Sequence, residues 1–193
     1  MPFYEVQHSH PLTATQKHTL ARHITHLHST TFLTPSLYVN VVFQYLAPTS
    51  TSTTYFLAGE PTAHHPAGPN RIFAMVRVSP QRTKADFDAL ALKIEDKWYE
   101  VVNETDGSGD TVEARASKKM HFVVFHPMIA ARENGVTIPD VGLLSHSIAS
   151  LTSGLLISPA YLALRLAYDH GDQQFKDMLD EIDSRADLKA LLS

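Results

Sequence analysis

The chain of 193 residues contains no cysteine, and this absence excludes several kinds of chemistry. Without a thiol there can be no disulfide bond, no cysteine nucleophile and no cysteine-ligated zinc. The sequence also has no glycine-rich phosphate-binding loop and no Gly-x-Ser-x-Gly motif. It therefore gives no support to nucleotide binding or to serine hydrolase chemistry.

Basic residues also do not outnumber acidic residues in this sequence. The net charge is −4, with 16 Lys and Arg against 20 Asp and Glu, which argues against a nucleic-acid-binding surface. The first residues lack a basic region followed by an apolar run, so they are not a secretory signal. We expect an intracellular, cytoplasmic protein.

The chain has one uncharged stretch, residues 141–164, that is long enough to cross a bilayer. It holds six Ser or Thr residues together with His146, Gly154 and Pro159. This composition is too polar for a membrane span, so we expect a packed or oligomer-facing helical segment and no membrane contact.

Two stretches of the sequence each predict a β-α-β unit. Residues 2–8 and 37–45 are rich in β-branched and aromatic side chains, and between them Thr13 and Gln16 form a capping box at the start of a helix. In the second unit, residues 71–78 and 120–125 are the strands and residues 83–103 the helix. Residues 105–118 are expected to be a loop.

Shorter elements complete the expected architecture. Residues 55–57 predict a short strand between polar loops at 47–54 and 58–70, and residues 128–133 predict a helical turn. From residue 143 the tail is expected to be helical, with a last short helix starting at Ser184. The fold class is therefore α/β (α+β): two fused β-α-β units, approximately 2–46 and 71–126, within residues 1–142, and a helical extension at 143–193.

Pro2 is the residue with the most distinctive chemistry. An initiator methionine before proline is normally removed, which would leave Pro2 as the N-terminal residue with a free secondary amine. An α-amino group has a pKa of about 7.7–8.0, and burial in an apolar pocket lowers it. Such an amine can serve as a general base or acid near neutral pH or attack a carbonyl group.

A proline at this position, followed by two β-α-β units, resembles the tautomerase superfamily, and within it the cis-3-chloroacrylic acid dehalogenase family. The resemblance covers about residues 2–46, 55–59 and 71–142. It is carried by specific stretches of this sequence: Leu12-Thr13 to Lys17-His18, Ala21, Ile24-Thr25, His28, Val42-Phe43-Gln44, Tyr55 to Gly59, Pro127 and Glu133-Asn134-Gly135.

The resemblance implies a set of catalytic residues. Pro2 falls on the catalytic proline of the family, His28 on a histidine that binds substrate and positions water, and Glu133 on a catalytic glutamate. The helical spacing from Ile24 indicates that His28 faces the sheet. An imidazole there suits a carboxylate or carbonyl oxygen.

The substrate-binding residues are carried over only in part. Arg82 falls on one of the family's two carboxylate-binding arginines, and Ser79 occupies the position of the other. Arg77 lies two residues before Ser79 and is expected on the same face of the strand, where it could replace the missing arginine. Phe122 occupies the position of the family's water-activating tyrosine, and the lost hydroxyl argues against dehalogenation.

The resemblance therefore implies a cofactor-independent enzyme that transfers protons on, or adds water to, a small 2-oxo or unsaturated carboxylic acid, with tautomerisation favoured. The alternatives are a non-catalytic oligomeric scaffold that kept the fold, and a decarboxylase of a 3-oxo acid. The family implies a homotrimer. The 12 histidines show no metal-binding spacing, so no metal is expected.

Overall fold

A four-stranded sheet forms the centre of the molecule. The computed structural model describes residues 2–47, 55–61, 69–104, 111–129, 132–133, 136–137 and 173–189. The strand order is β2-β1-β5-β6, and the strands are β1 (Phe3–His8), β2 (Asn40–Tyr45), β5 (Asn70–Val76) and β6 (Met120–Pro127). β1 pairs with β2 in parallel and β5 with β6 in parallel, whereas β1 and β5 are antiparallel. The two expected β-α-β units are thus confirmed, joined through β1 and β5.

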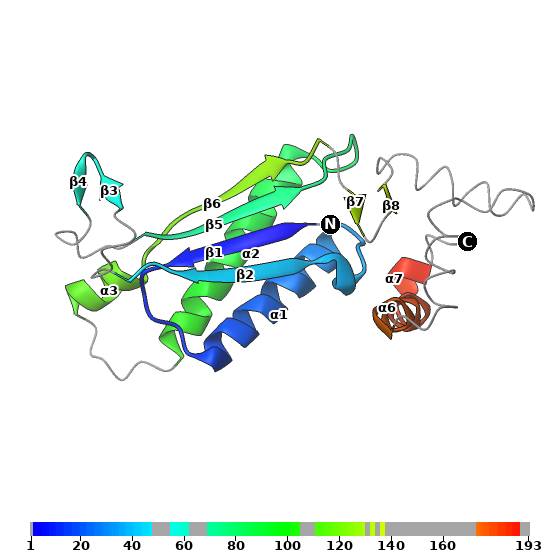
Figure 1. Cartoon of the computed structure of the whole chain (residues 1–193), viewed down its shortest axis with the longest axis horizontal. Helices are drawn as coiled ribbons and strands as arrows, with labels where there is room; N and C mark the ends of the chain where they lie inside the picture. Colours follow the sequence, from blue (N-terminus) through cyan, green and yellow to red (C-terminus); the bar gives the residue numbers. More distant parts are fainter. Residues whose placement is uncertain are drawn as a thin grey trace, which may run out of the picture.

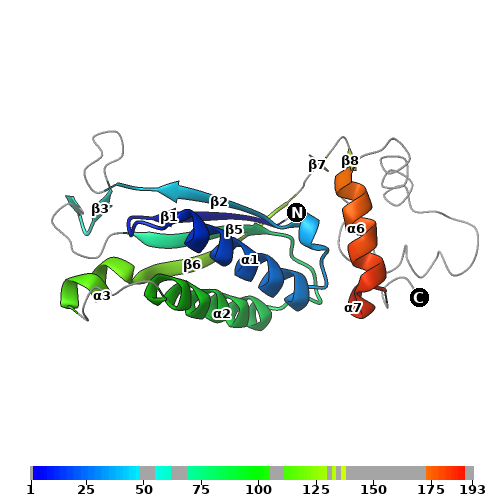
Figure 2. The same ribbon diagram turned by 90° about the horizontal axis from the view of Figure 1, so that it is seen from below.

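Two long helices, α1 (Ala14–Thr31) and α2 (Lys84–Asn103), cover one face of this sheet (Figures 1 and 2). Each begins at a threonine with a complete capping box: Thr13 pairs with Gln16, and Thr83 pairs with Asp86. These reciprocal bonds satisfy backbone amides that a helix start leaves without partners. The long helices of the two units therefore begin with the same capping structure.

The hydrophobic core lies between the helices and the sheet. In β1, alternate residues are buried, as expected when one face of a strand packs against helices. The fully buried side chains with the largest volumes come from both units and include Trp98, Tyr4, Leu20, Ile24, Ile72, Leu90 and Ile94. Both units therefore share one core.

No described element covers the opposite face of the sheet. Val42, Met75 and Phe122 are 42%, 46% and 37% exposed there, and Phe73 packs edge-on against Phe122 with 5.3 Å between ring centroids. Arg71 lies over the Phe73 ring and donates a hydrogen bond to Gln7. Glu5 and Gln7 of β1 point to the same face, so it carries both apolar and polar side chains.

Several local predictions were wrong. Residues 37–39 were expected to begin a strand, but Ser36–Tyr38 form a 3₁₀ helix, η1, and β2 starts only at Asn40. The loop expected at 105–118 contains helix α3 (Val112–Lys118). The side chain of Thr111 caps it, and Glu113 at its start and Lys118 at its end favour the helix dipole. That cap was not recognised because the segment is charged and follows glycines.

The helical turn expected at 128–133 is also absent from its described part. Arg132–Glu133 instead form β7, which pairs with β8 (Val136–Thr137) as a short hairpin. The short strand expected at 55–57 is present as β3 (Phe56–Leu57), which pairs with β4 (Glu60–Pro61).

The tail ends in two helices, α6 (Gln173–Ser184) and α7 (Ala186–Lys189), near η1 and the start of β1 (Figure 2). Met178 and Leu188 are 1% and 3% exposed, so this segment packs firmly. The described part of the expected helical extension is confirmed, whereas its beginning and the uncharged stretch lie outside the described residues. Among the described helices, none has the length and apolar character to span a membrane.

Candidate functional site

Pro2 lies immediately before β1, at the end of the sheet closest to α6. Its side chain is buried, and its carbonyl oxygen accepts a hydrogen bond from the Asn40 amide at 3.1 Å. This bond fixes the start of β1 to the start of β2. Because strand residues alternate between faces, Pro2 shares the helix-covered face with Tyr4.

His28 approaches the same place from the last turn of α1. It is 1% exposed, on the buried face that also carries Leu20 and Ile24, as the helical spacing indicated. Its Nδ1 lies 2.7 Å from the Tyr4 hydroxyl. Burial, and then the positive charges of Arg82 and of the N-terminus of the chain, lower the pKa of His28 from 6.5 to about 3. His28 is therefore neutral at physiological pH.

Tyr4 determines which nitrogen of His28 carries the proton. Burial raises the pKa of Tyr4 well above its ordinary value, so the hydroxyl stays protonated. In the described part of the structure the Tyr4 hydroxyl has no other acceptor for its proton, so we assign it as the donor to Nδ1, which leaves the imidazole proton on Nε2. Among the described residues Nε2 has no hydrogen-bond partner. It is a donor available to an oxygen of a bound molecule.

Arg82 lies in the second unit, in the turn between β5 and α2, and contacts the first unit. Its guanidinium donates to the carbonyl oxygens of Arg77 and Phe32, both at 3.3 Å, and to Thr34 Oγ1 at 3.5 Å. It also lies 4.9 Å from the centre of the Phe32 ring, and that ring is 5.0 Å from His28. Phe32 therefore contacts both cation and imidazole.

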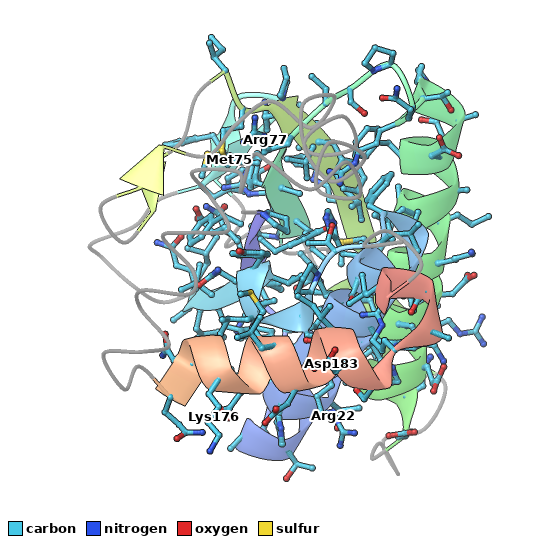
Figure 3. The ribbon with its side chains drawn as sticks, turned by 90° about the vertical axis from the view of Figure 1, so that its right-hand side faces the viewer. Arg22, Met75, Arg77, Lys176 and Asp183 are labelled. Atoms are coloured by element: carbon cyan, nitrogen blue, oxygen red, sulfur yellow. The ribbon has the colours of Figure 1, made fainter. Side chains whose placement is uncertain are left out.

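Positive charge gathers at this end of the sheet. Burial, and then the charge of Arg77, lower the pKa of the Arg82 guanidinium, although an arginine remains charged in proteins. Arg77 follows β5 directly (Figure 3). Arg82 and Arg77 therefore form one positive field, in which an anion would relieve the repulsion between like charges.

Ser79 lies in the turn between the two arginines. Its carbonyl oxygen accepts a hydrogen bond from the Arg82 amide at 3.0 Å, and the two residues form an isolated β-bridge. The Ser79 hydroxyl is buried without a hydrogen-bond partner in the described structure. Since buried polar atoms are normally paired, this hydroxyl is a second group at the site that a ligand could satisfy.

The remaining two expected residues lie apart from this cluster. Phe122 is on the open face of the sheet, opposite Arg71 in the β5–β6 register, so within one chain it does not join Pro2 and His28. The backbone of Glu133 lies in the β7–β8 hairpin, at the same end of the molecule as the start of β1 (Figure 1). Its side chain is outside the described part of the structure.

No metal site emerges from the described residues: His, Asp and Glu side chains do not gather there in groups of three or more. Two adjacent histidines of the sequence, His64 and His65, lie outside the described residues. A shallow groove of about 300 Å³ is lined by Ala21, Arg22, Thr25, His26 and Ser36. None of the expected site residues borders it.

Tyr4 and Phe32 contact His28 although neither was predicted from the sequence as part of the site. Alternation along β1 could have placed Tyr4 on the same face as Pro2, because the two are separated by two positions. Phe32 follows the helix end, where no periodic pattern predicts the direction of a side chain.

Comparison with known proteins identifies the family of the chain. Residues 1–145 match the model of the Tautomerase_3 family, described as "putative oxalocrotonate tautomerase enzyme". No curated protein matches the chain at a significant level.

Three solved structures are among the similar ones. The wild-type F6 fused 4-OT asymmetric trimer has a TM-score of 0.50 and 18% identity, covering 70% of this chain and 94% of that one. N1, a member of the cis-3-chloroacrylic acid dehalogenase family, has a TM-score of 0.50 and 18% identity, covering 79% and 94%. Native Ps01740 is 26% identical, with a TM-score of 0.45 and coverage of 68% and 99%.

At 18% identity, these structural matches establish a shared fold. The family match is broader evidence, since it spans most of the chain and both β-α-β units. The resemblance stated from the sequence is confirmed. The chain belongs to this family of tautomerase enzymes.

Proposed function

We propose that this protein is a cofactor-independent tautomerase that moves a proton between two atoms of a small 2-oxo carboxylic acid, with the amine of Pro2 as the base. The observation that carries the proposal is the meeting of three groups at one end of the sheet. Pro2 shares the helix-covered face of β1 with Tyr4, which is hydrogen bonded to His28. Arg82 is close enough to lower the pKa of His28. These residues would supply a base, an anion-binding cation and a neutral hydrogen-bond donor.

Pro2 would exchange the proton. Its side chain is buried, and Arg77 follows the end of β5 that pairs with the start of β1. Burial and neighbouring cations both disfavour an ammonium ion, so once Met1 is removed we expect the Pro2 amine to be largely neutral near pH 7. The amine would take the proton from an enol oxygen and return it to carbon, which leaves the formula of the substrate unchanged.

Arg82 would hold the carboxylate. Its hydrogen bonds to Phe32, Thr34 and Arg77 are long, between 3.3 and 3.5 Å, and long bonds are weak. They engage three of the five N–H groups of the guanidinium, which leaves two for a ligand. Arg77 would add charge from the end of β5. A carboxylate bound to a guanidinium gains charge-assisted hydrogen bonds.

His28 would polarise the oxygen of the reacting carbonyl or enol. Because its pKa is lowered to about 3, it acts as a neutral donor through Nε2–H, and the Tyr4 hydroxyl fixes that tautomer. A donor that is already oriented stabilises the charge that develops on oxygen during proton transfer.

Water addition and dehalogenation have less support. Both need a group that activates water, and Phe122, at the position of the activating tyrosine, has no hydroxyl and lies on the open face. Glu133 remains our candidate for a polar partner that orients the substrate, contributed by the β7–β8 hairpin. Tautomerisation needs neither residue to activate water.

We further propose that the chain assembles as a homotrimer through the open face of the sheet. The exposed apolar side chains Val42, Met75 and Phe122 form the kind of patch that marks a protein contact. The fused 4-OT structure with the same fold is itself described as a trimer. Sedimentation of the purified protein would test this part of the proposal separately.

The test of the activity is ketonisation of phenylenolpyruvate by the Met-processed protein, with removal of Met1 verified by mass spectrometry. We expect Pro2→Ala to lower kcat by at least about 100-fold, the usual contribution of general acid–base catalysis. Arg82→Gln should mainly raise KM. Arg22→Gln, an exposed arginine on α1, is the matched control and should keep both constants.

Equal rates for the wild type and Pro2→Ala would refute the role of the amine. An absence of turnover in both, with an intact fold, would favour a scaffold that kept the family's architecture without its activity.

A further inference from the structure

The helical segment α6–α7 lies beyond the family match, which ends at residue 145, and contacts η1 and the end of α1 next to the site. It lies across the end of the molecule where the strands of the first unit begin (Figure 3). Met178 and Leu188 anchor it by burial. Two of its residues, Glu181 and Arg185, make polar contacts with the chain around the end of α1.

Glu181 of α6 caps η1. Both of its carboxylate oxygens accept a hydrogen bond from the Ser36 amide, at 3.1 and 2.9 Å, and Oε1 also accepts one from the Ser36 hydroxyl at 2.8 Å. Pro35, at the cap position of η1, makes no side-chain cap of its own. An acidic group from 145 positions away therefore supplies the acceptor that the start of a helix requires.

Arg185, between α6 and α7, uses all five of its N–H donors. Two go to the Asp187 carboxylate at 3.1 and 2.7 Å, and one to Glu181 Oε1 at 2.9 Å. The other two go to Ser29, one to its hydroxyl and one to its carbonyl oxygen at 3.3 Å. The hydrogen bond to Asp187 is the main cause that raises the pKa of Arg185.

Ser29 links Arg185 to the turn of residues 32–36, which also contacts Arg82. Its carbonyl oxygen accepts a hydrogen bond from the Thr34 amide at 3.0 Å, and its hydroxyl donates to the Thr34 carbonyl at 2.5 Å. Arg82 in turn donates to Phe32 and Thr34 on the same turn. Leu33, between them, has a φ of +48°, a conformation that a leucine adopts only when its surroundings hold it.

We propose that Glu181 and Arg185 are positioning residues for substrate binding: they hold the turn of residues 32–36 so that Arg82 presents its free donors to a carboxylate. This inference rests on the proposed function, because it takes Arg82 as the carboxylate anchor. The contacts of Arg82 with the turn are too long to hold the guanidinium by themselves. Arg185 and Glu181 hold this turn through Ser29 and Ser36. The additional restraint keeps the guanidinium of Arg82 in position.

The experiment compares Arg185→Gln and Glu181→Gln in the full chain with Lys176→Gln, an exposed residue on the same helix (Figure 3). Each variant is assayed with phenylenolpyruvate and with its methyl ester, which has no carboxylate. We expect the two positioning variants to raise KM for the acid by about 3- to 10-fold. Constants for the ester, and both constants of Lys176→Gln, should not change.

Amide hydrogen exchange supplies a readout independent of turnover. The Ser36 and Thr34 amides bond to Glu181 and Ser29, so their protection should fall in Arg185→Gln and Glu181→Gln, and persist in Lys176→Gln. The milder Glu181→Gln variant keeps the test available if Arg185→Gln does not fold.

Each contrary result has a separate meaning. If Arg82→Gln raises KM for the acid but the positioning variants do not, the inference is refuted and the proposed function stands. If Arg82→Gln also leaves KM unchanged, Arg82 is not the anchor and the inference falls, while the comparison with Pro2→Ala still decides whether the protein is a tautomerase. Equal losses with the acid and the ester would show general destabilisation, which also overturns the inference.

Discussion

Acidification should destabilise this protein through His28. In the folded chain its pKa is lowered to about 3, whereas an unfolded histidine titrates near 6.5. The folded state thus binds fewer protons than the unfolded state between these two values. The contribution of His28 to the free energy of unfolding is therefore fully present above pH 6.5 and is lost as the pH falls from 6.5 toward 3.

The size of the effect follows from linkage. A shift of this size corresponds to an upper limit of about 5 kcal/mol, reached only below about pH 3. Between about pH 7.5 and about pH 5, protonation of the unfolded histidine alone removes about 2 kcal/mol. His28 is 1% exposed, so solvent screening reduces this little.

The assay is urea unfolding of the wild type and His28→Asn at these two pH values. The amide side chain of this variant would accept the Tyr4 hydrogen bond without titrating, so the loss of stability on acidification should be about 2 kcal/mol smaller than in the wild type. Burial also lowers the pKa of His8, but His8 is present in both proteins and cancels. His18→Asn, which removes an exposed histidine from the same helix, should keep the wild-type pH dependence. Identical pH dependence in the wild type and His28→Asn would refute the reasoning.

Three further substitutions test other contacts. Tyr4→Phe leaves His28 Nδ1 without its partner, so urea unfolding should show a loss of about 1–3 kcal/mol, and ¹⁵N chemical shifts should show a mixture of tautomers. Asn70→Ala removes an amide that accepts from the Ser9 and His10 amides and donates to the Ser117 and Lys119 carbonyls, at a cost of about 2–4 kcal/mol in the same measurement. Leu33→Gly relieves the positive φ, so it should add up to about 1 kcal/mol to the free energy of unfolding and raise the melting temperature. A lower melting temperature would mean that the contacts of the leucine side chain outweigh the strain.

The architecture was predictable because its signals are local. The capping boxes at Thr13 and Thr83 and the alternation in β1 are written in neighbouring residues, and hydrophobic periodicity separates strands from helices. The errors fall where the deciding interaction is distant. η1 depends on a cap from Glu181, 145 positions away, and no window around residues 36–38 contains that information.

The site was predictable only as a set of residue types. The family resemblance pointed to Pro2, His28 and Arg82, and the structure brings these together. It could not show that His28 is neutral, since that follows from burial and from two positive charges on other elements. It also could not show that Phe122 and Arg82 lie on different sides of the sheet, because that depends on the β5–β6 register, which shifts between Asn70 and Arg71.

The neutral state of His28 decides how this site can work. A histidine whose pKa is about 3 cannot deliver a proton at neutral pH, so it is a poor general acid. In the proposed reaction proton transfer therefore rests on the amine of Pro2, and His28 contributes a fixed hydrogen bond. The guanidinium of Arg82, which helps to keep His28 neutral, would also disfavour protonation of the amine and would attract the carboxylate. One cluster of positive charge would thereby prepare the base and bind the substrate, without a metal or an organic cofactor in the reaction.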